Sequence, residues 1–214
     1  MTRHHLVAAS TLVVLLAAGP AAAQTAPPPA VAVRGFLLVG AESFTASQTF
    51  TATMGKSSGL VFGGGGEVAL RSGIFVRVSA SRYRNTGQRA ISLEGQVFQL
   101  GIPLTASIVP IEVTGGYRFL GFGRVVPYAG GGFGSYKYTE TSQFADPSEN
   151  VSSRFSGSHA LGGVDVSITR WLRAGGEIQY TSVPNAFGKG GLSQQFNETN
   201  LGGTTFRMVV SVGR

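Results

Sequence analysis

The alternation of apolar and polar residues is the feature of this sequence that most restricts its fold. In the segment IEVTGGYRF, residues 111–119, Ile111 and Val113 fall on one face of an extended chain, and Glu112 and Arg118 fall on the other. The segments GIFVRVSAS, LRAGGEIQY and TFRMVVSVGR repeat the pattern. A period of two is typical of strands with one apolar face, whereas helices show a period of about 3.6.

The pattern predicts an all-β chain of eight strands. We place these strands at residues 32–44, 58–70, 73–85, 104–119, 124–138, 153–168, 171–182 and 203–213. They are longer than the mean of about 5–6 residues in soluble sheets, and they reach the ~9–11 residues that cross a membrane at a tilt. Strand length therefore favours a membrane protein over a soluble sandwich.

The connections between the expected strands alternate in length. Short turns join the second strand to the third, the fourth to the fifth and the sixth to the seventh. The other four connections are long and rich in Ser, Thr, Asn, Gln and Gly, near residues 45–57, 86–103, 139–152 and 183–202. Short turns on one side and long polar loops on the other are typical of an antiparallel up-and-down transmembrane β-barrel, whose closure leaves no unpaired strand edge in lipid.

The N-terminus has the composition of a secretory signal. A basic start, TRHH, precedes the apolar run LVAASTLVVLLAA and a small-residue cleavage site, AAAQ. We expect cleavage after Ala23, which makes residues 1–23 a signal peptide, because the run of about 13 residues is shorter than a spanning helix. The proline-rich residues 24–30 are expected to form a periplasmic tether, and residues 31–214 the barrel.

Glycine and aromatic residues have expected places in such a barrel. The runs GGGG at 63–66 and GGGFG at 130–134 lie in strands, where glycines leave room for long Arg and Glu side chains inside a narrow lumen. We expect aromatic residues at the two membrane interfaces. Near the short turns these are Phe119, Phe122 and Trp171, and toward the long loops they are Phe44, Tyr83, Tyr136, Tyr138 and Tyr180.

The polar faces of the strands bring charged residues into one lumen. The ten residues are Arg34, Glu42, Glu67, Arg77, Glu112, Arg118, Asp165, Arg173, Glu177 and Arg207. Because an unpaired charge in a narrow interior costs several kcal/mol, this balanced set predicts interlocking ion pairs that fill the lumen and conduct little. The alternative is a catalytic carboxylate pair or an ion path.

A second set of cations is expected near the long-loop rim. Its members are Arg82, Arg84, Arg89, Lys137, Arg154 and Lys189. Arg binds phosphate through charge-assisted hydrogen bonds, so these side chains could face the lipopolysaccharide of an outer leaflet, or they could be ordinary solvated loop charge. The basic excess of the whole chain, 17 Lys and Arg against 10 Asp and Glu, is scattered, and no nucleic-acid partner is expected.

Three segments carry a family resemblance: VVPYAGGGFGSYKY, GGVDVSITRWLRAGGEIQYTSVPNA and IEVTGGYRF. They resemble the small outer-membrane barrels of the OmpA/OmpX-like porin family, also called the outer membrane protein β-barrel domain family. The resemblance covers roughly residues 31–214. It implies a bacterial outer-membrane location with both chain ends in the periplasm, and it implies roles as anchors, adhesins, narrow channels or occasional enzymes.

One further comparison concerns His159. The segment SGSHALGGVD invites comparison with outer-membrane lipid A deacylases, which carry a His followed two residues later by Ser. Leu161 stands at that position here, so the motif fails. An enzyme that modifies outer-membrane lipid is kept only as a minor alternative.

The sequence thus predicts a non-enzymatic, monomeric outer-membrane barrel without a cofactor. Its long loops are expected to meet lipopolysaccharide or an extracellular ligand. A narrow passive channel for small solutes is the second hypothesis. A secreted ligand-carrying barrel is another, but outward rows of Ile, Val, Leu and Tyr would aggregate in water.

Overall fold

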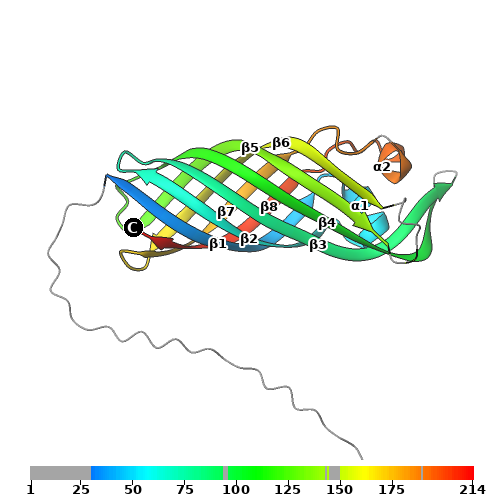
Figure 1. The fold of residues 1–214 in the computed structure, drawn as a ribbon, viewed down its shortest axis with the longest axis horizontal. Coiled ribbons are helices and arrows are strands. Elements are labelled where there is room, and N and C mark those ends of the chain that lie inside the picture. The colour runs from blue at the N-terminus through cyan, green and yellow to red at the C-terminus, as the bar shows by residue number, and fades with distance from the viewer. Residues whose placement is uncertain (1–29, 94–95, 143, 145–149, 189) are drawn as a thin grey trace, which may run out of the picture.

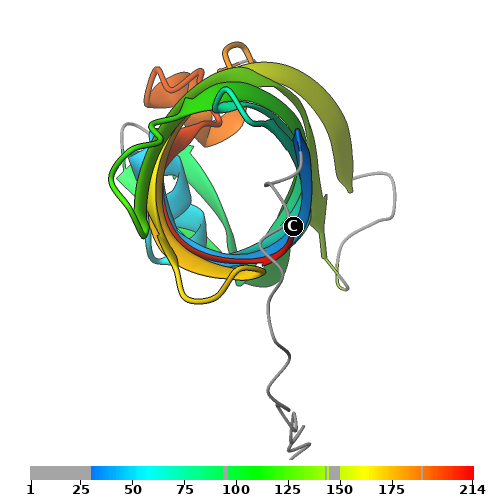
Figure 2. The same ribbon diagram turned by 90° about the vertical axis from the view of Figure 1, so that its left-hand side faces the viewer.

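The strands close into a barrel, as the sequence predicts. The computed structural model describes residues 30–93, 96–142, 144, 150–188 and 190–214. Each strand pairs antiparallel with its neighbours in sequence, and β1 pairs with β8 (Figures 1 and 2). The all-β, eight-stranded, up-and-down architecture is confirmed. The expected signal peptide, residues 1–23, lies outside the described residues, as does nearly all of the expected tether, residues 24–30.

The elements follow one another in a simple order. The strands are β1 (Val31–Phe44), β2 (Ser58–Leu70), β3 (Ile74–Leu93), β4 (Gln96–Arg118), β5 (Val125–Thr141), β6 (Val151–Ser167), β7 (Leu172–Ser182) and β8 (Gly203–Gly213). Two short helices, α1 (Ser47–Met54) and α2 (Gly191–Gln195), lie in long connections. No helix in the described part of the chain is long and apolar enough to cross a membrane.

The two ends of the barrel differ, as the alternation of connections predicts. The short turns lie at one end, together with the start of β1 and the C-terminus (Figure 1). Both helices and the far end of the β3–β4 hairpin lie at the other end. We call these the short-turn end and the long-loop end.

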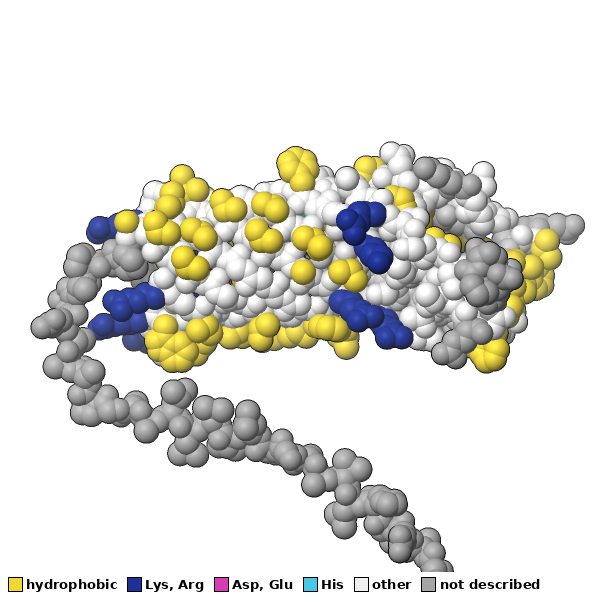
Figure 3. All heavy atoms as spheres, in the orientation of Figure 1, with side chains coloured by type: hydrophobic (Ala, Val, Ile, Leu, Met, Phe, Trp, Pro, Cys, Tyr) yellow, Lys and Arg dark blue, Asp and Glu magenta, His cyan; other side chains and the backbone are white. Residues whose placement is uncertain are grey.

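Side-chain burial alternates along each strand because successive residues point to opposite faces of the sheet. In β3, Phe75 and Arg77 point inward and are buried, whereas Ile74, Val76 and Val78 point outward and are about half exposed. The outward face is therefore apolar, and Figure 3 shows hydrophobic side chains spread over the wall of the barrel. Such an arrangement suits contact with lipid.

Two inward glycines are required by the close approach of a neighbouring strand. A Cβ atom on Gly132 would lie 1.9 Å from the backbone oxygen of Val113, and one on Gly65 would lie 2.0 Å from that of Val78. Gly134 serves the expected purpose of making room for charge, since its Cβ would lie 3.0 Å from Cγ of Glu112.

One connection departs from the prediction. Residues 86–103, expected as a polar loop, continue β3 and β4 into a long hairpin that runs to the pair Leu93 and Gln96, with a register shift between Gln88 and Ala90. Antiparallel pairing satisfies the backbone groups of this segment, and its β-branched and aromatic residues favour extended chain. The hairpin projects beyond the other strands at the long-loop end (Figure 1).

Candidate functional site

The lumen near the short-turn end is filled by ion pairs around Glu67. Its carboxylate accepts hydrogen bonds from Arg118 at 2.8 Å, Arg77 at 3.0 Å and Arg34 at 3.2 Å. Arg118 also reaches Asp165 on β6, with Nη1 and Oδ2 2.6 Å apart. One carboxylate of β2 thus holds three guanidinium groups from β1, β3 and β4, and Arg118 extends the network to a fifth strand, β6.

Glu177 on β7 is the second centre of the network. It accepts a hydrogen bond from Nη1 of Arg77 at 2.5 Å and another from Arg207 on β8. The phenol of Tyr128 donates to the same carboxylate at 2.9 Å. Arg77 contacts both Glu67 and Glu177, so it joins the two centres into one network.

Aromatic rings pack against the guanidinium groups. The guanidinium carbon of Arg118 lies 4.7 Å from the ring centre of Tyr128, and that of Arg77 lies 4.9 Å from the ring centre of Phe36. Cation–π contact adds to the ion pairs when the groups are desolvated. The space left among the network side chains is too narrow to admit a water-sized sphere. This part of the lumen is packed rather than water-filled.

A smaller polar cluster lies on the next inward positions toward the long-loop end. The carboxylate of Glu112 accepts hydrogen bonds from Tyr136 at 2.8 Å and from Gln179 at 2.9 Å, and it lies 3.7 Å from Nδ1 of His159. Nε2 of His159 lies 2.8 Å from the hydroxyl of Thr114. His159 is buried at an inward position of β6, on the opposite face of the sheet from the apolar outer wall.

All ten residues expected in the lumen occupy inward strand positions. Seven of them join the ion pairs around Glu67 and Glu177, and Glu112 belongs to the smaller cluster. Glu42 and Arg173 point inward but form no ion pair with another described residue. Sequence reasoning missed Tyr128, Tyr136 and Gln179 as members of the polar network, although Gln179 shares the inward parity of Glu177, and the two Tyr residues share that of the glycines of β5.

The long-loop mouth is closed by an apolar plug, which we define as Phe44, Phe50, Tyr83, Tyr138 and Phe187. Phe44 stacks on Phe50 of α1 with ring centres 4.0 Å apart, and it meets Tyr83 edge-on at 4.8 Å. Tyr138 meets Phe187 of the β7–β8 connection at 5.4 Å. The connections before β2 and β8 therefore fold into the mouth and cover the polar lumen.

The plug corrects the expected aromatic belt. Phe44, Tyr83, Tyr136 and Tyr138 lie toward the long loops, but on inward positions, where each is at most 7% exposed. Of the five aromatic residues expected there, Tyr180 alone faces outward, at 54% exposed. The reason is parity, because these side chains share the inward face of their strands with the lumenal glycines and charges.

The loops at the long-loop end are tied together by Glu198. Its carboxylate accepts hydrogen bonds from the backbone N–H groups of Gln48 and Thr49, both at 2.9 Å. These N–H groups begin α1, where a negative charge is favourable. A surface pocket of about 450 Å³ lies beside this contact, and it is lined by Ser47, Gln48, Thr51, Ala52, Val97, Gln99 and Phe196.

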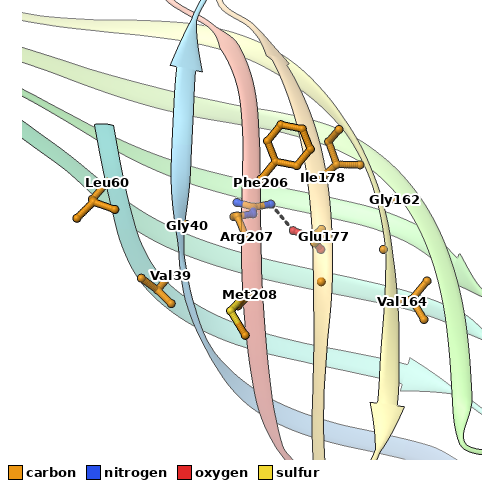
Figure 4. A pocket seen from close by; sticks show the side chains of 12 residues that line it. Val39, Gly40, Leu60, Gly162, Val164, Glu177, Ile178, Phe206, Arg207 and Met208 are labelled. Atoms are coloured by element: carbon orange, nitrogen blue, oxygen red, sulfur yellow. Dashed lines mark hydrogen bonds and ion pairs between the residues drawn. The ribbon is translucent and has the colours of Figure 1, made fainter. Parts of the chain in front are cut away.

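A hollow of about 750 Å³ lies on the outer wall over β6, β7, β8, β1 and β2. Side chains of Val39, Ile178 and Met208 surround it (Figure 4). The ion pair between Arg207 and Glu177 belongs to the sheet behind it. The hollow lies on the outward face of the strands, and most of its lining side chains are apolar like the rest of that face.

The cations expected at the rim fall into three groups by their location. Arg82, Arg84, Lys137 and Arg154 are exposed on outward positions of β3, β5 and β6. Arg89 lies farther out in the β3–β4 hairpin and is half-buried. Lys189 lies outside the described residues.

Comparison with known proteins agrees with this architecture. The family model of the outer membrane protein beta-barrel domain matches residues 8–212. The Neisserial surface protein A, NspA, is similar in structure with a TM-score of 0.54 and 15% identity, over 86% of this chain and 97% of that one. A major outer membrane protein from Thermus thermophilus has a TM-score of 0.50 and 11% identity, over 85% and 99% of the two chains. No curated protein matches the sequence.

Proposed function

Because the chain belongs to the outer membrane protein beta-barrel domain family, which places it in the bacterial outer membrane, we propose that it is a non-enzymatic surface-interaction protein. In this proposal the barrel is a closed, monomeric anchor, and the long-loop end is outside the cell. Residues 1–23 direct export, residues 24–30 form a periplasmic tether, and the barrel begins at residue 31.

The observation that carries the proposal is the projecting β3–β4 hairpin. Its outer part exposes the apolar side chains of Ile91, Leu93, Val97, Phe98 and Leu100, each 39–58% exposed. Arg82 is the first charged residue after the apolar outward positions of β3, so it marks the upper edge of the lipid-facing band. Leu93 lies eleven residues beyond it, or about 36 Å farther along the strand. Apolar side chains that gather so far from the lipid-facing band are typical of a surface that binds a partner.

The closed lumen supports an anchor rather than a channel. The ion-pair network leaves no space for water near the short-turn end, and the apolar plug covers the mouth. A solute would have to displace both layers in series. The network instead joins opposite walls of the barrel, as a rigid support for the extracellular loops requires.

The buried polar groups support a non-enzymatic role. His159 contacts Thr114 and Glu112 within the packed interior, where neither membrane lipid nor an extracellular substrate reaches it. Catalysis on a lipid would need a nucleophile or base within hydrogen-bond reach of that lipid.

Retention of cells on surfaces tests the proposal. Cells that display the wild-type protein should be retained on polystyrene, an apolar surface, several-fold better than cells without it. The variant Ile91→Ser, Leu93→Ser, Phe98→Ser should lose this difference. The control Phe144→Ser, which changes a 75% exposed residue outside the hairpin, should keep it. Equal retention of the hairpin variant and the wild type, with both barrels folded, would refute the proposal.

A further inference from the structure

The outer wall of β3 to β6 changes character along its height. Strand register places Val78, Val113 and Phe133 side by side on β3, β4 and β5, and all three point outward and are exposed. On these three strands they form the last fully apolar row before the long-loop end, and Ser158 of β6 is the partner of Phe133. Acyl chains of the outer leaflet would pack against this row.

A row of cations follows toward the long-loop end. Lys137 on β5 pairs with Arg154 on β6 and with Val109 on β4. Arg82 on β3 lies on the other side of Val109, because the next residues of the two strands, Tyr83 and Ile108, are partners. Three cations from three strands thus lie at one level of the wall.

Arg84 and hydroxyl groups form the level above. Arg84 is the partner of Ser107, Ser107 of Thr139, and Thr139 of Ser152. A pocket of about 330 Å³ spans these two levels and the next one, and it is lined by Arg82, Arg84, Thr105, Ser107, Val109, Lys137, Thr139 and Thr141. Its polar lining combines cations with hydroxyl groups, which together suit an anion with several oxygen atoms.

No carboxylate in the described part of the chain pairs with Arg82, Arg84, Lys137 or Arg154. This contrasts with the lumen, where Arg77, Arg118 and Arg207 all bind acidic partners. The outer-wall cations therefore remain available to an anion from outside the protein.

The height of the cations matches the level of lipid headgroups. Arg82 lies eight residues from Ile74, the first residue of β3. At about 3.3 Å per residue this is about 26 Å along the strand, or about 20 Å across the membrane at the usual tilt, close to the ~25 Å apolar band of such barrels. Figure 3 shows cationic side chains on both sides of the hydrophobic band on this face.

Among the described strand positions, the outward cations at this height lie on one side of the barrel, and Lys56, just before β2, is an exposed cation outside this cluster. Toward the long-loop end, the outward positions of the other four strands carry Tyr180, Thr204, Ser43 and Ser58, which are partners in successive ladders. A general girdle of interfacial cations would surround the barrel. A one-sided cluster is instead what a site for a single ligand requires.

We infer that the outer wall of β3–β6 is a binding site for the phosphate groups of a phosphorylated glycolipid in the outer leaflet, lipid A. Arg82, Lys137 and Arg154 contact one phosphate level, Arg84 and the hydroxyl groups hold the headgroup above it, and the acyl chains cover the row of Val78. The inference rests on the proposed function, which puts the long-loop end outside the cell.

Binding of purified lipid A to the folded protein in nanodiscs tests the site. The variant Arg82→Gln, Arg84→Gln, Lys137→Gln, Arg154→Gln should raise the Kd for bisphosphorylated lipid A at least tenfold. The control Arg71→Gln, Arg124→Gln, Arg170→Gln, which removes exposed cations at the short turns, should change it less than twofold. The charge-conserving variant Arg82→Lys, Arg84→Lys, Arg154→Lys should stay within a few fold of the wild type.

Two outcomes would overturn the inference. An equal loss in the short-turn control would mean that general positive charge, not this wall, attracts the lipid. Full competition by inorganic phosphate or by a heparin fragment at matched phosphate or sulfate concentration would mean a site for soluble anions instead of a lipid. Folding of each variant is checked on a gel, where the unboiled, folded barrel should migrate faster than the same sample after boiling. The cell-retention assay is scored separately, so a failed glycolipid site is distinguishable from a failed surface-interaction role.

Discussion

Arg77 of β3 and Glu177 of β7 meet across the lumen, with Nη1 and Oε2 2.5 Å apart. The two strands are four places apart in a closed ring of eight, so this one ion pair joins opposite walls. An eight-stranded barrel is just narrow enough for inward side chains to fill it. At this level the interior of the barrel is filled with side chains. The ion pair can form only when the ring of strands is closed, so it stabilises the closed barrel.

Removing the Glu177 charge should destabilise the barrel. In Glu177→Gln, Arg77 and Arg207 lose their shared carboxylate and remain buried, which costs on the order of 3–5 kcal/mol for a broken buried pair. Denaturant unfolding of the protein in lipid vesicles measures this change. The control Arg71→Gln, at an exposed turn, should change the free energy of unfolding by less than about 0.5 kcal/mol. A loss below about 1 kcal/mol in Glu177→Gln would contradict the role of the network.

The Glu198 contact should hold α1 over the mouth. In Glu198→Ala, the N–H groups of Gln48 and Thr49 lose their acceptor, at a cost of about 1 kcal/mol. Amide hydrogen exchange within α1 should then become about five times faster, since 1 kcal/mol is roughly that factor. Gln195→Ala, at an exposed position of α2, is the control. Unchanged protection of α1 in Glu198→Ala would show that the plug side chains hold the helix alone.

The inward glycines should be far less tolerant than an outward one. Gly132→Ala puts a Cβ atom 1.9 Å from the backbone oxygen of Val113, so strands β4 and β5 must move apart. Gly115→Ala meets no atom within 4 Å on the outer face. A gel run without boiling should show less folded protein for Gly132→Ala and a normal amount for Gly115→Ala. Equal folding of both variants would argue against close strand approach at Gly132.

The periodic part of the fold could be predicted from the sequence. Alternation at Ile111 to Arg118 assigned each side chain to the lumen or to lipid, and the alternation of connection lengths assigned the two ends of the barrel. Both signals are local, because strand parity depends only on neighbours in the chain. The structure places all ten expected lumenal residues on inward positions for this reason.

The pairing of those residues could not be predicted. Which inward side chains meet depends on the stagger of strands around the closed ring, a property of the whole sheet. Arg77 therefore meets Glu67 on a neighbouring strand and Glu177 on the opposite wall, while Glu42 and Arg173 join no pair among the described residues.

The long-loop end was the least predictable part. Helices α1 and α2 have eight and five residues, too short for a 3.6-residue period to stand out. The extension of β3 and β4 was hidden by Gly, Gln and Ser between its apolar residues. The cation cluster on the outer wall needs the register of β3 to β6, which joins Arg82 to residues about 55 and 72 positions away, Lys137 and Arg154.

The most direct test of the account is the conductance of the folded protein in a planar lipid bilayer. The lumen is filled by the ion-pair network near the short-turn end and covered by the apolar plug at the long-loop end. We therefore predict no steady conductance steps from folded protein, as identified on a gel by its faster migration when it is not boiled. Reproducible steps that scale with the amount of folded protein, and that vanish when the sample is boiled first, would contradict a closed anchor and would favour a narrow channel.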